Sequence, residues 1–414
     1  MLLFMYIDPG TGSMLFTILI GVLSAGYYFL RNSFMKMKFK ISGGNIKEQD
    51  SDRIPYAIFT DSKRYLTIFK PICDEMEKRG EKLVYLTAEK DDPLLNEKYE
   101  HVRTEFLGEG NRAYARMNML KADIVLSTTP GLDVYQWKGS GDVKWYAHVL
   151  HAAGDVTMYR MFGIDYYDAM LLSGDFQIKQ VRDLEALRGL PEKEAKLVGI
   201  PHMDALRKRL LETGDSSSKE HETTILLAPS WGPSSILNKY GKKMIDELIA
   251  TGYKIIIRPH PQTFVSEKEM IEPLMKAYPE SDKLKWDRNI DNFDTLNQSD
   301  ILISDFSGVI LDYALVFDRP VIFAETSFDN GIYDSWWLKE REWIFETLDK
   351  IGIRLTSENM KNIKELINTG LTDTRLKEER DKARAESWAY MGKSVENIAD
   401  YLIEKRKELA AGEQ

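Results

Sequence analysis

Two side chains that suit phosphate chemistry lie together in the segment Arg258-Pro259-His260-Pro261, which directly follows the apolar run 253–257 (YKIII). The prolines on either side of the histidine stop the chain from continuing as a strand or a helix, and so fix the direction of His260. An arginine and an imidazole at a strand end are suited to bind a phosphate, or a leaving group that gains negative charge. A rigid turn with an incidental histidine is the alternative interpretation.

A second candidate anion site is the segment Ser304-Asp305-Phe306-Ser307-Gly308, which follows the apolar run DILI and precedes a helix expected at 309–317. Two hydroxyls and a glycine at a helix start would place free backbone N–H groups and the positive end of the helix dipole on one spot. An ordinary helix start with Ser307 as N-cap is the alternative. One turn further on, Asp312 could hold a ribose hydroxyl or be a solvated helix residue.

A third candidate is His151, at the end of the apolar run 143–150 (VKWYAHVL) and followed by the small residues Ala152-Ala153-Gly154. Small neighbours leave room for a substrate, and a histidine at a strand end titrates near neutrality. If it acts as a base, the rate should fall at acid pH around an imidazole pKa of ~6.5. The odd spacing from His148 would place the two rings on opposite faces of a strand, so no metal pair is expected and His148 is interpreted as structural.

Short apolar runs alternate with helical stretches along most of the chain. Strands are expected at 56–59, 82–86, 122–127, 143–150 and 169–173, and, after the polar loop 214–218, at 224–228, 253–258, 300–304 and 320–323. Helices are expected at 65–78, 112–121, 175–187, 235–250 and 309–317. This alternation predicts an α/β fold with two Rossmann-like domains facing across a cleft. The three candidate segments then lie at the carboxyl ends of strands, where open α/β sheets bind ligands.

The N-terminal segment has the pattern of a membrane anchor. No charged side chain lies between Asp8 and Arg31, and the apolar run 14–30 with its uncharged flank approaches the ~20 residues that cross a bilayer. The cluster 31–40 holds four basic residues and no acid, which predicts Met1 outside and the rest of the chain in the cytoplasm. A cleaved signal peptide would carry its positive charges before the apolar run, and a buried core helix is the other alternative.

Composition excludes several classes of protein. The net charge of −9 argues against a nucleic-acid binder. The single cysteine, Cys73, rules out an intrachain disulfide and a cysteine-based zinc site, which agrees with a reducing compartment. No convincing Asp-x-Asp motif occurs, so neither a metal nor another cofactor is expected.

The domain organisation follows from these patterns. We expect a transmembrane anchor at 1–31, a basic and polar linker at 32–53, and an N-terminal Rossmann-like domain at 54–213. A C-terminal Rossmann-like domain is expected at 214–360. The charged tail 361–414 is expected to form helices on the outside, bridging the two halves.

Several segments together resemble a known family. Ala228-Pro229-Ser230-Trp231-Gly232, the RPHP segment, the SDFSG segment, Asp312 and Arg319-Pro320 occur in the order typical of the CDP-glycerol glycerophosphotransferase family. The segment 198–204 is similar to the family's Gly-x-Pro-x-x-Asp junction, and 150–155 occupies the place of its histidine-glycine motif. The resemblance covers roughly residues 120–325. Enzymes of this family build glycerol-phosphate or ribitol-phosphate polymers of the teichoic-acid type.

The sequence departs from the family pattern in three segments. The usual His-Gly-Thr-Pro is here His151-Ala-Ala-Gly, and His202 stands where an arginine often follows Gly-x-Pro. The second serine of Ser-Asp-x-Ser-Ser is Gly308. These changes lie around the expected acceptor and phosphate sites, so they bear on the identity of the alcohol and the acceptor.

The resemblance implies a GT-B fold and in-line transfer of an alcohol phosphate from CDP-glycerol, or a related CDP-alcohol, to a hydroxyl of a lipid-linked or cell-surface polymer, with release of CMP. His151 would be the general base, and His260 would act at the leaving group. By this resemblance, 54–213 is the acceptor domain and 214–360 the domain that binds the CDP-alcohol donor. The implied donor-binding residues are Arg258, Ser304, Asp305, Ser307, Gly308, Asp312 and Arg319. Two alternatives remain: a nucleotide-sugar glycosyltransferase or epimerase on the same fold, and a non-catalytic, membrane-anchored nucleotide-binding scaffold.

Overall fold

The computed structural model describes residues 53–412, except for 216–220, 290 and 325–327. The chain divides into two units at Arg53 and Ile54, and the architecture below belongs to the second unit. The predicted membrane helix at 14–30 lies outside the described residues. Within the described ranges, no helix combines the length and the apolar character needed to cross a membrane.

The first half of the described unit is built on a seven-stranded sheet in which every neighbouring pair is parallel. The strand order is β3-β2-β1-β4-β5-β6-β7, so it reverses direction between β1 and β4. This reversal is the topological switch point, where open α/β sheets bind ligands. The strands are β1 Ile54–Thr60, β2 Leu83–Thr87, β3 Val102–Phe106, β4 Ala122–Ser127, β5 Val143–Val149, β6 Ala169–Leu172 and β7 Glu194–Leu197.

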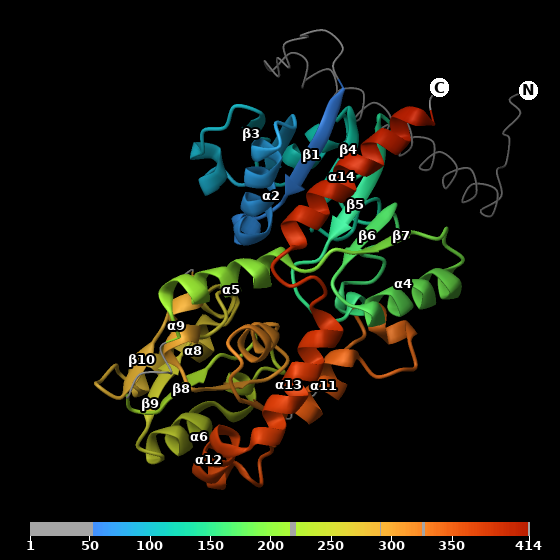
Figure 1. Cartoon of the computed structure of the whole chain (residues 1–414). Coiled ribbons are helices and arrows are strands. Elements are labelled where there is room, and N and C mark those ends of the chain that lie inside the picture. Colours follow the sequence, from blue (N-terminus) through green and yellow to red (C-terminus); the bar gives the residue numbers. More distant parts are fainter. Residues whose placement is uncertain (1–52, 216–220, 290, 325–327, 413–414) are drawn as a thin grey trace, which may run out of the picture. The chain divides into compact units, whose positions relative to one another are not determined.

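The second half repeats this plan with six parallel strands in the order β10-β9-β8-β11-β12-β13. Its switch point lies between β8 and β11. The predicted α/β class with two Rossmann-like sheets is therefore confirmed (Figure 1). The strands are β8 Thr224–Leu227, β9 Lys254–Ile257, β10 Leu284–Trp286, β11 Ile301–Ser304, β12 Val321–Ala324 and β13 Gly352–Leu355.

Helices cover both faces of each sheet, so the central strands are buried along their whole length. In β1, Ile58 packs into the core on one face and Phe59 into the core on the other. The helices are α2 Leu66–Lys78, α3 Asn111–Met117, α4 Asp175–Arg188, α5 Pro201–Thr213, α6 Ile236–Ala250, α7 Thr263–Ser266, α8 Lys268–Ala277, α9 Phe293–Gln298, α10 Val309–Leu311, α11 Trp343–Ile351, α12 Ile363–Thr372, α13 Thr374–Ser387 and α14 Ser394–Ala411.

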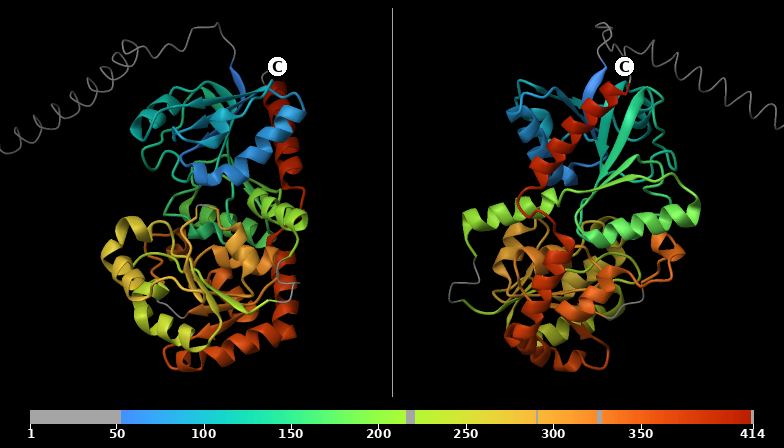
Figure 2. Two further views of the ribbon diagram at one scale, coloured as in Figure 1. Left: turned by 90° about the vertical axis from the view of Figure 1, so that its left-hand side faces the viewer. Right: turned by 45° about the vertical axis from the view of Figure 1, so that its right-hand side comes forward.

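The C-terminal helices belong to both halves. Ile363 and Ile367 of α12 enter the core of the second sheet, whereas Ile398 and Leu402 of α14 enter the core of the first. The chain therefore returns at its end to the half in which its described part begins, as both views in Figure 2 show.

The segment 198–204 contacts the chain where it passes back to the first half, between α13 and α14. Gly199 has φ +98°, and a Cβ there would lie 2.7 Å from the carbonyl oxygen of Ala389, so a side chain is excluded on both counts. The Asp204 carboxylate accepts hydrogen bonds from the backbone N–H of Gly392 at 2.7 Å and of Ser394 at 3.0 Å. The Gly-x-Pro-x-x-Asp segment thus holds the connection between α13 and α14, beside the start of α5.

Candidate active site

Polar residues, among them the predicted His151, His260 and Ser307, lie at the carboxyl ends of strands in both sheets. In the first half, Arg64 belongs to the short 3-10 helix Lys63–Tyr65 after β1, and His151 follows β5 by two residues. In the second half, Ser307 follows β11 and His260 follows β9 by three residues. Both sheets therefore present polar groups where ligands of this fold class bind.

His151 is held by two hydroxyl groups. Its Nδ1 lies 3.1 Å from Oγ1 of Thr128 and 3.1 Å from the hydroxyl oxygen of Tyr159, and the Tyr65 ring centroid is 5.3 Å from that of His151. When Nδ1 donates its proton to one of these oxygens, Nε2 presents a lone pair. Nε2 has no hydrogen-bond partner in the described part of the chain. This arrangement suits a general base.

The surroundings of His151 keep its ring neutral. Burial, followed by the positive charges of Arg64 and His202, lowers the pKa of His151 to about 4. The sequence-based expectation of an acid limb at an ordinary imidazole pKa is therefore revised downward for the free protein. A bound diphosphate would oppose this shift, because negative charge stabilises the imidazolium.

The two histidines of this region converge on one hydroxyl, contrary to the expectation that their rings lie on opposite faces. His148 is fully buried, and its Nε2 lies 3.0 Å from the Tyr159 hydroxyl that also contacts His151. The strand geometry fails as a guide because β5 ends at Val149, so that His151 belongs to the following turn. Burial lowers the pKa of His148 to about 3, which agrees with its predicted structural role.

His260 is oriented by its own turn. The backbone N–H of Gln262 donates to Nδ1 of His260 at 3.1 Å, so the proton of the neutral ring resides on Nε2. Burial, and then the charge of Arg64, lowers the pKa of His260. The exposed Trp231 ring lies beside it, with 6.4 Å between ring centroids. His260 is thus a neutral hydrogen-bond donor at the carboxyl edge of the second sheet.

Ser304 and Asp305 organise the neighbouring loop. Ser304 Oγ donates to the carbonyl of Ala228 at 2.6 Å, and the buried Asp305 carboxylate accepts from the backbone N–H groups of Ser230 and Ile236, each at 2.9 Å. Burial raises the pKa of Asp305, although these N–H donors oppose the shift. Their contacts favour a positioning role for both predicted donor-binding residues, in which they join the 228–232 and 304–308 segments.

Ser307 and Gly308 remain accessible at the end of β11. The predicted helix at 309–317 is interrupted: α10 spans only Val309–Leu311 and a π-helical turn, Asp312–Val316, follows. Gly308 occupies the N-cap position, one residue after Ser307, which the alternative interpretation of this segment made the N-cap. The Ser307 hydroxyl is therefore not used to cap this helix.

Asp312 lies against His202, one of the residues that depart from the family pattern. His202 Nε2 is 3.2 Å from Oδ2 of Asp312, and its Nδ1 is 2.9 Å from Oγ1 of Thr67 in α2. Burial lowers the pKa of His202, but the carboxylate more than compensates and raises it above the usual value. Asp312 is thus engaged in a contact between the halves, and a second role at a ribose is only a prediction.

The two predicted arginines are engaged within the protein. Arg258 forms an ion pair with Asp287 and donates to the carbonyl of Asn289 at 2.7 Å. Although burial raises the pKa of Asp287, hydrogen bonds from Thr295 and Asn289 and the Arg258 guanidinium lower it overall. Arg319 is buried and donates to backbone carbonyls that include those of Leu296 and Asn297, each at 2.9 Å. These contacts favour a structural role for Arg319.

Asp155 connects the halves beside His151. Its carboxylate accepts from the backbone N–H groups of Trp343 at 2.7 Å and Ile344 at 2.9 Å, at the start of α11, and from Nε2 of Gln180 at 2.6 Å. Side-chain acceptors at this position satisfy N–H groups that have no partner within the helix. A carboxylate from the first half therefore caps a helix of the second.

We expect Asp155→Ala to lower the free energy of unfolding by about 2–6 kcal/mol, because the N–H groups of Trp343 and Ile344, partly and fully buried, lose their acceptor at ~1–3 kcal/mol each. Urea denaturation measures this change. Asp175→Ala is the matched control, since Asp175 is an exposed carboxylate in the first turn of α4. Its loss should cost less than about 1 kcal/mol. Equal losses for the two variants would contradict the cap.

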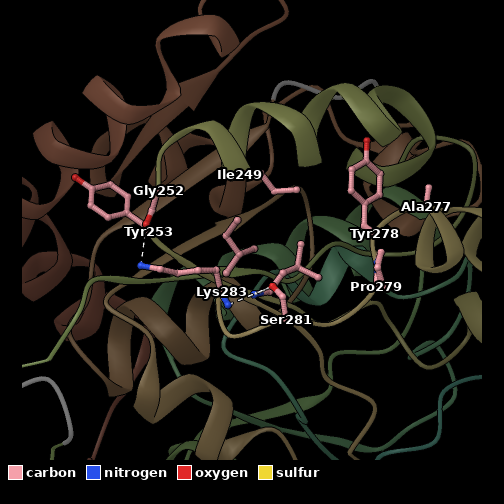
Figure 3. A pocket seen from close by; sticks show the side chains of 10 residues that line it. Ile249, Gly252, Tyr253, Ala277, Tyr278, Pro279, Ser281 and Lys283 are labelled. Atoms are coloured by element: carbon pink, nitrogen blue, oxygen red, sulfur yellow. Dashed lines mark hydrogen bonds between the residues drawn. The ribbon is translucent and has the colours of Figure 1, made fainter.

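A pocket elsewhere in the second half does not coincide with this site. It is lined by Ile249, Gly252, Tyr253, Ile255, Ala277, Tyr278, Pro279, Ser281, Lys283 and Leu284 (Figure 3). Lys283 Nζ donates to the carbonyl of Gly252 at 3.2 Å, just before β9 begins. The pocket thus lies at the amino ends of β9 and β10, whereas His260 follows the carboxyl end of β9.

Several site residues escaped the sequence-based reasoning. Arg64 and Thr128 follow predicted strands, so the strand-end rule could have identified them. Tyr159 lies in an irregular segment between β5 and β6, and no sequence signal connects its hydroxyl with the two histidines. The pairing of His202 with Asp312 was equally hidden, since 110 positions separate them.

The fold places the protein among GT-B-like structures. The wall teichoic acid polymerase TagF gives a TM-score of 0.59 at 16% sequence identity, covering 94% of this chain and 98% of that one. A TagF variant soaked with CDPG gives a TM-score of 0.58 at the same 16% identity, covering 94% and 98%. A UDP-GlcNAc 2-epimerase from Methanocaldococcus jannaschii gives 0.55 at 16% identity, covering 84% of this chain and 99% of its own. Such likenesses establish the fold alone.

The sequence identifies the family. The profile of the CDP-Glycerol:Poly(glycerophosphate) glycerophosphotransferase family matches residues 167–404, more than half of the chain. The chain belongs to this family, as its motifs predict, and is an enzyme of the glycerophosphotransferase type. No curated protein shows significant similarity to it.

Proposed function

We propose that this enzyme transfers glycerol phosphate, or a related alditol phosphate, from a CDP-alcohol to a hydroxyl of a lipid-linked or cell-surface polymer. The observation that carries the proposal is the presence of two neutral imidazoles with different free atoms, one in each half. His151 offers the lone pair of Nε2, and His260 offers the N–H of Nε2. One group accepts a proton while the other stabilises negative charge, as transfer of a phosphoryl-alcohol requires.

The reaction proceeds by in-line displacement at the β-phosphorus of the donor. The acceptor oxygen forms a bond to this phosphorus while its proton passes to Nε2 of His151. The bond between the β-phosphorus and the bridging oxygen breaks, and its electron pair leaves with CMP. The N–H of His260 donates to a phosphate oxygen that gains charge. Ser307 and the backbone at Gly308 supply further donors to the diphosphate.

Release of CMP tests the proposal directly. Purified full-length protein would be incubated with a panel of CDP-alcohols and a membrane extract as the source of acceptor, and the released nucleotide identified. CMP supports the proposal. Release of UDP from a nucleotide sugar, or epimerisation of the sugar, would establish the alternative enzyme class instead. Binding of CDP-alcohol without turnover would indicate a nucleotide-binding scaffold.

We expect Ser307→Ala to weaken the affinity for the CDP-alcohol by about ten- to a hundredfold, the worth of a hydrogen bond to a charged group, ~1.5–3 kcal/mol. Calorimetric titration measures this. Ser307 is a sharper probe than Arg258, whose removal would also leave Asp287 without its ion pair. Ser357→Ala, an exposed serine after β13, is the control. Unchanged affinity in a folded Ser307→Ala protein would remove Ser307 from the donor site.

A lipid-linked acceptor would lie in the membrane, so a membrane anchor on the enzyme would fit the proposed reaction. We propose that residues 14–30 span the cell membrane once, with Met1 outside and the catalytic part on the cytoplasmic face. Confinement to the bilayer would raise the effective concentration of a lipid-linked acceptor. Deletion of residues 1–40 should release the protein from membranes, as ultracentrifugation can measure. A reporter fused after Gln414 that is active only outside the cell would reverse the orientation.

A further inference from the structure

Arg64 lies at the switch point of the first sheet, where β1 ends. It belongs to the 3-10 helix Lys63–Tyr65, whose N-cap Ser62 accepts from the backbone N–H of Arg64. The Arg64 guanidinium carbon stands 4.7 Å from the centroid of the Tyr65 ring, and that ring lies 5.3 Å from the ring of His151. The side chain is therefore stacked on the wall of the site that holds the proposed base.

In the part of the chain that the structure describes, no carboxylate forms an ion pair with Arg64. Among the ion pairs of the described residues none includes Arg64, although its side chain is exposed. Its neighbour Lys63 pairs with Asp91 and lies 3.8 Å from Glu89. A cation that lacks a counter-ion beside a proposed base makes proton uptake by that base harder. A substrate anion that binds beside Arg64 would neutralise this charge.

Arg64 is also within electrostatic reach of both halves of the site. Its charge lowers the pKa of His151 in the first half and of His260 in the second. The other charged or titratable groups that influence these rings are His202 at His151 and Glu267 at His260. Arg64 is the one group that acts on both histidines in the described part of the chain.

We propose that Arg64 binds the phosphoryl group during its transfer from CMP to the acceptor hydroxyl. This inference rests on the proposed function, which assigns His151 to the attacking oxygen and His260 to the leaving group. The transferred group then lies between them, with its charge spread over oxygens that are neither attacking nor leaving. The Arg64 guanidinium, stacked on the ring that packs against His151, is placed on the side of the attacking oxygen to donate to these oxygens. Because donor binding is assigned to the second half, Arg64 stabilises the transition state more than it increases the affinity for the donor.

The test compares variants of Arg64 that separate charge from packing. Arg64→Met keeps an apolar stem against Tyr65 but removes the charge, whereas Arg64→Lys keeps a charge. Lys63→Ala is the matched control, since that neighbouring cation is already paired. We expect Arg64→Met to lower kcat for CMP release by about a hundredfold, the typical effect of removing one hydrogen-bond donor from a site where negative charge develops. Arg64→Lys should have an intermediate kcat, and Lys63→Ala should have a kcat near that of the unmodified protein.

Two further readouts distinguish this role from a structural one. The affinity of Arg64→Met for CDP-alcohol should change less than about tenfold, since most ground-state contacts remain. Its acid limb in kcat/KM should move to higher pH, because the loss of a positive charge raises the pKa of His151. If unmodified protein releases CMP and Arg64→Met is equally fast, the inference fails and the proposed function stands. A loss of donor affinity as large as the loss of kcat would make Arg64 a donor-binding residue and would also overturn it. If the unmodified protein releases no CMP, the proposed function itself fails.

Discussion

Replacement of His151 by alanine should lower kcat for CMP release by about 10²–10⁴-fold, the usual contribution of a general base. The affinity for the CDP-alcohol should stay nearly unchanged, because His151 lies in the half assigned to the acceptor. The ring touches Thr128, Tyr65 and Tyr159, all from the first half, and its Nε2 is left for a substrate. Steady-state kinetics and calorimetric titration of the donor would measure the two effects separately.

His101→Ala is the matched control for this variant. His101 lies just before β3, at the edge of the first sheet, where its ring lies beside Gly80. It should leave both kcat and donor affinity unchanged. Near-full turnover in His151→Ala would show that the base is elsewhere. Loss of donor binding in His151→Ala, together with a normal His260→Ala, would show that the two halves have been assigned the wrong way round.

The pH dependence of the unmodified enzyme provides an independent check on His151. The base must be neutral, and its pKa in the free protein is lowered to about 4, so kcat/KM should stay constant until the pH approaches that value. The profile of kcat describes the complex, in which the donor phosphates raise this pKa. Its acid limb should therefore lie at higher pH than that of kcat/KM. An acid limb of kcat/KM near ~6.5 would belong to a group with an ordinary imidazole pKa and not to His151.

The central strands of both sheets could be predicted from the sequence, and the edge strands could not. Strands such as β4 (ADIVLS) and β11 (ILIS) are buried on both faces and therefore consist mostly of apolar residues. The four missed strands β3, β7, β10 and β13 are the outermost strands of the two sheets. Sequences such as VRTEF in β3 and EAKL in β7 are partly exposed, so they lack the apolar run on which the prediction depends.

The location of the candidate site could be predicted from the sequence because of the topology of parallel sheets. Residues after parallel strands gather at one edge of the sheet, and this rule identified His151 and His260 without any knowledge of packing. The rule cannot tell which polar groups at that edge remain available. Ser304 and Asp305 form hydrogen bonds with the backbone of Ala228 and Ser230, up to 76 positions earlier in the sequence. Arg319 donates to the backbone carbonyl of Leu296. Only tertiary structure distinguishes such residues from Ser307.

Replacement of His260 by alanine should lower kcat/KM by about 10²–10³-fold, the typical cost of removing one preorganised donor from a site of developing negative charge. The hydrogen bond from Gln262 to Nδ1 fixes the ring and leaves the proton on Nε2. This donor can serve the bound diphosphate and the transition state alike, so both donor affinity and kcat should fall. His151→Ala should affect kcat alone, and this contrast separates the two histidines.

His260→Gln and His260→Asn test the atom that is responsible. Glutamine can place an amide N–H near the position of Nε2, whereas asparagine reaches only to the position of Nδ1, where an acceptor for Gln262 is needed. We therefore expect His260→Gln to retain more activity than His260→Asn, and both to fold normally. The reverse order would mean that the turn around Gln262 matters more than the donor. In that case His260 would position the RPHP segment, and another group would stabilise the leaving CMP.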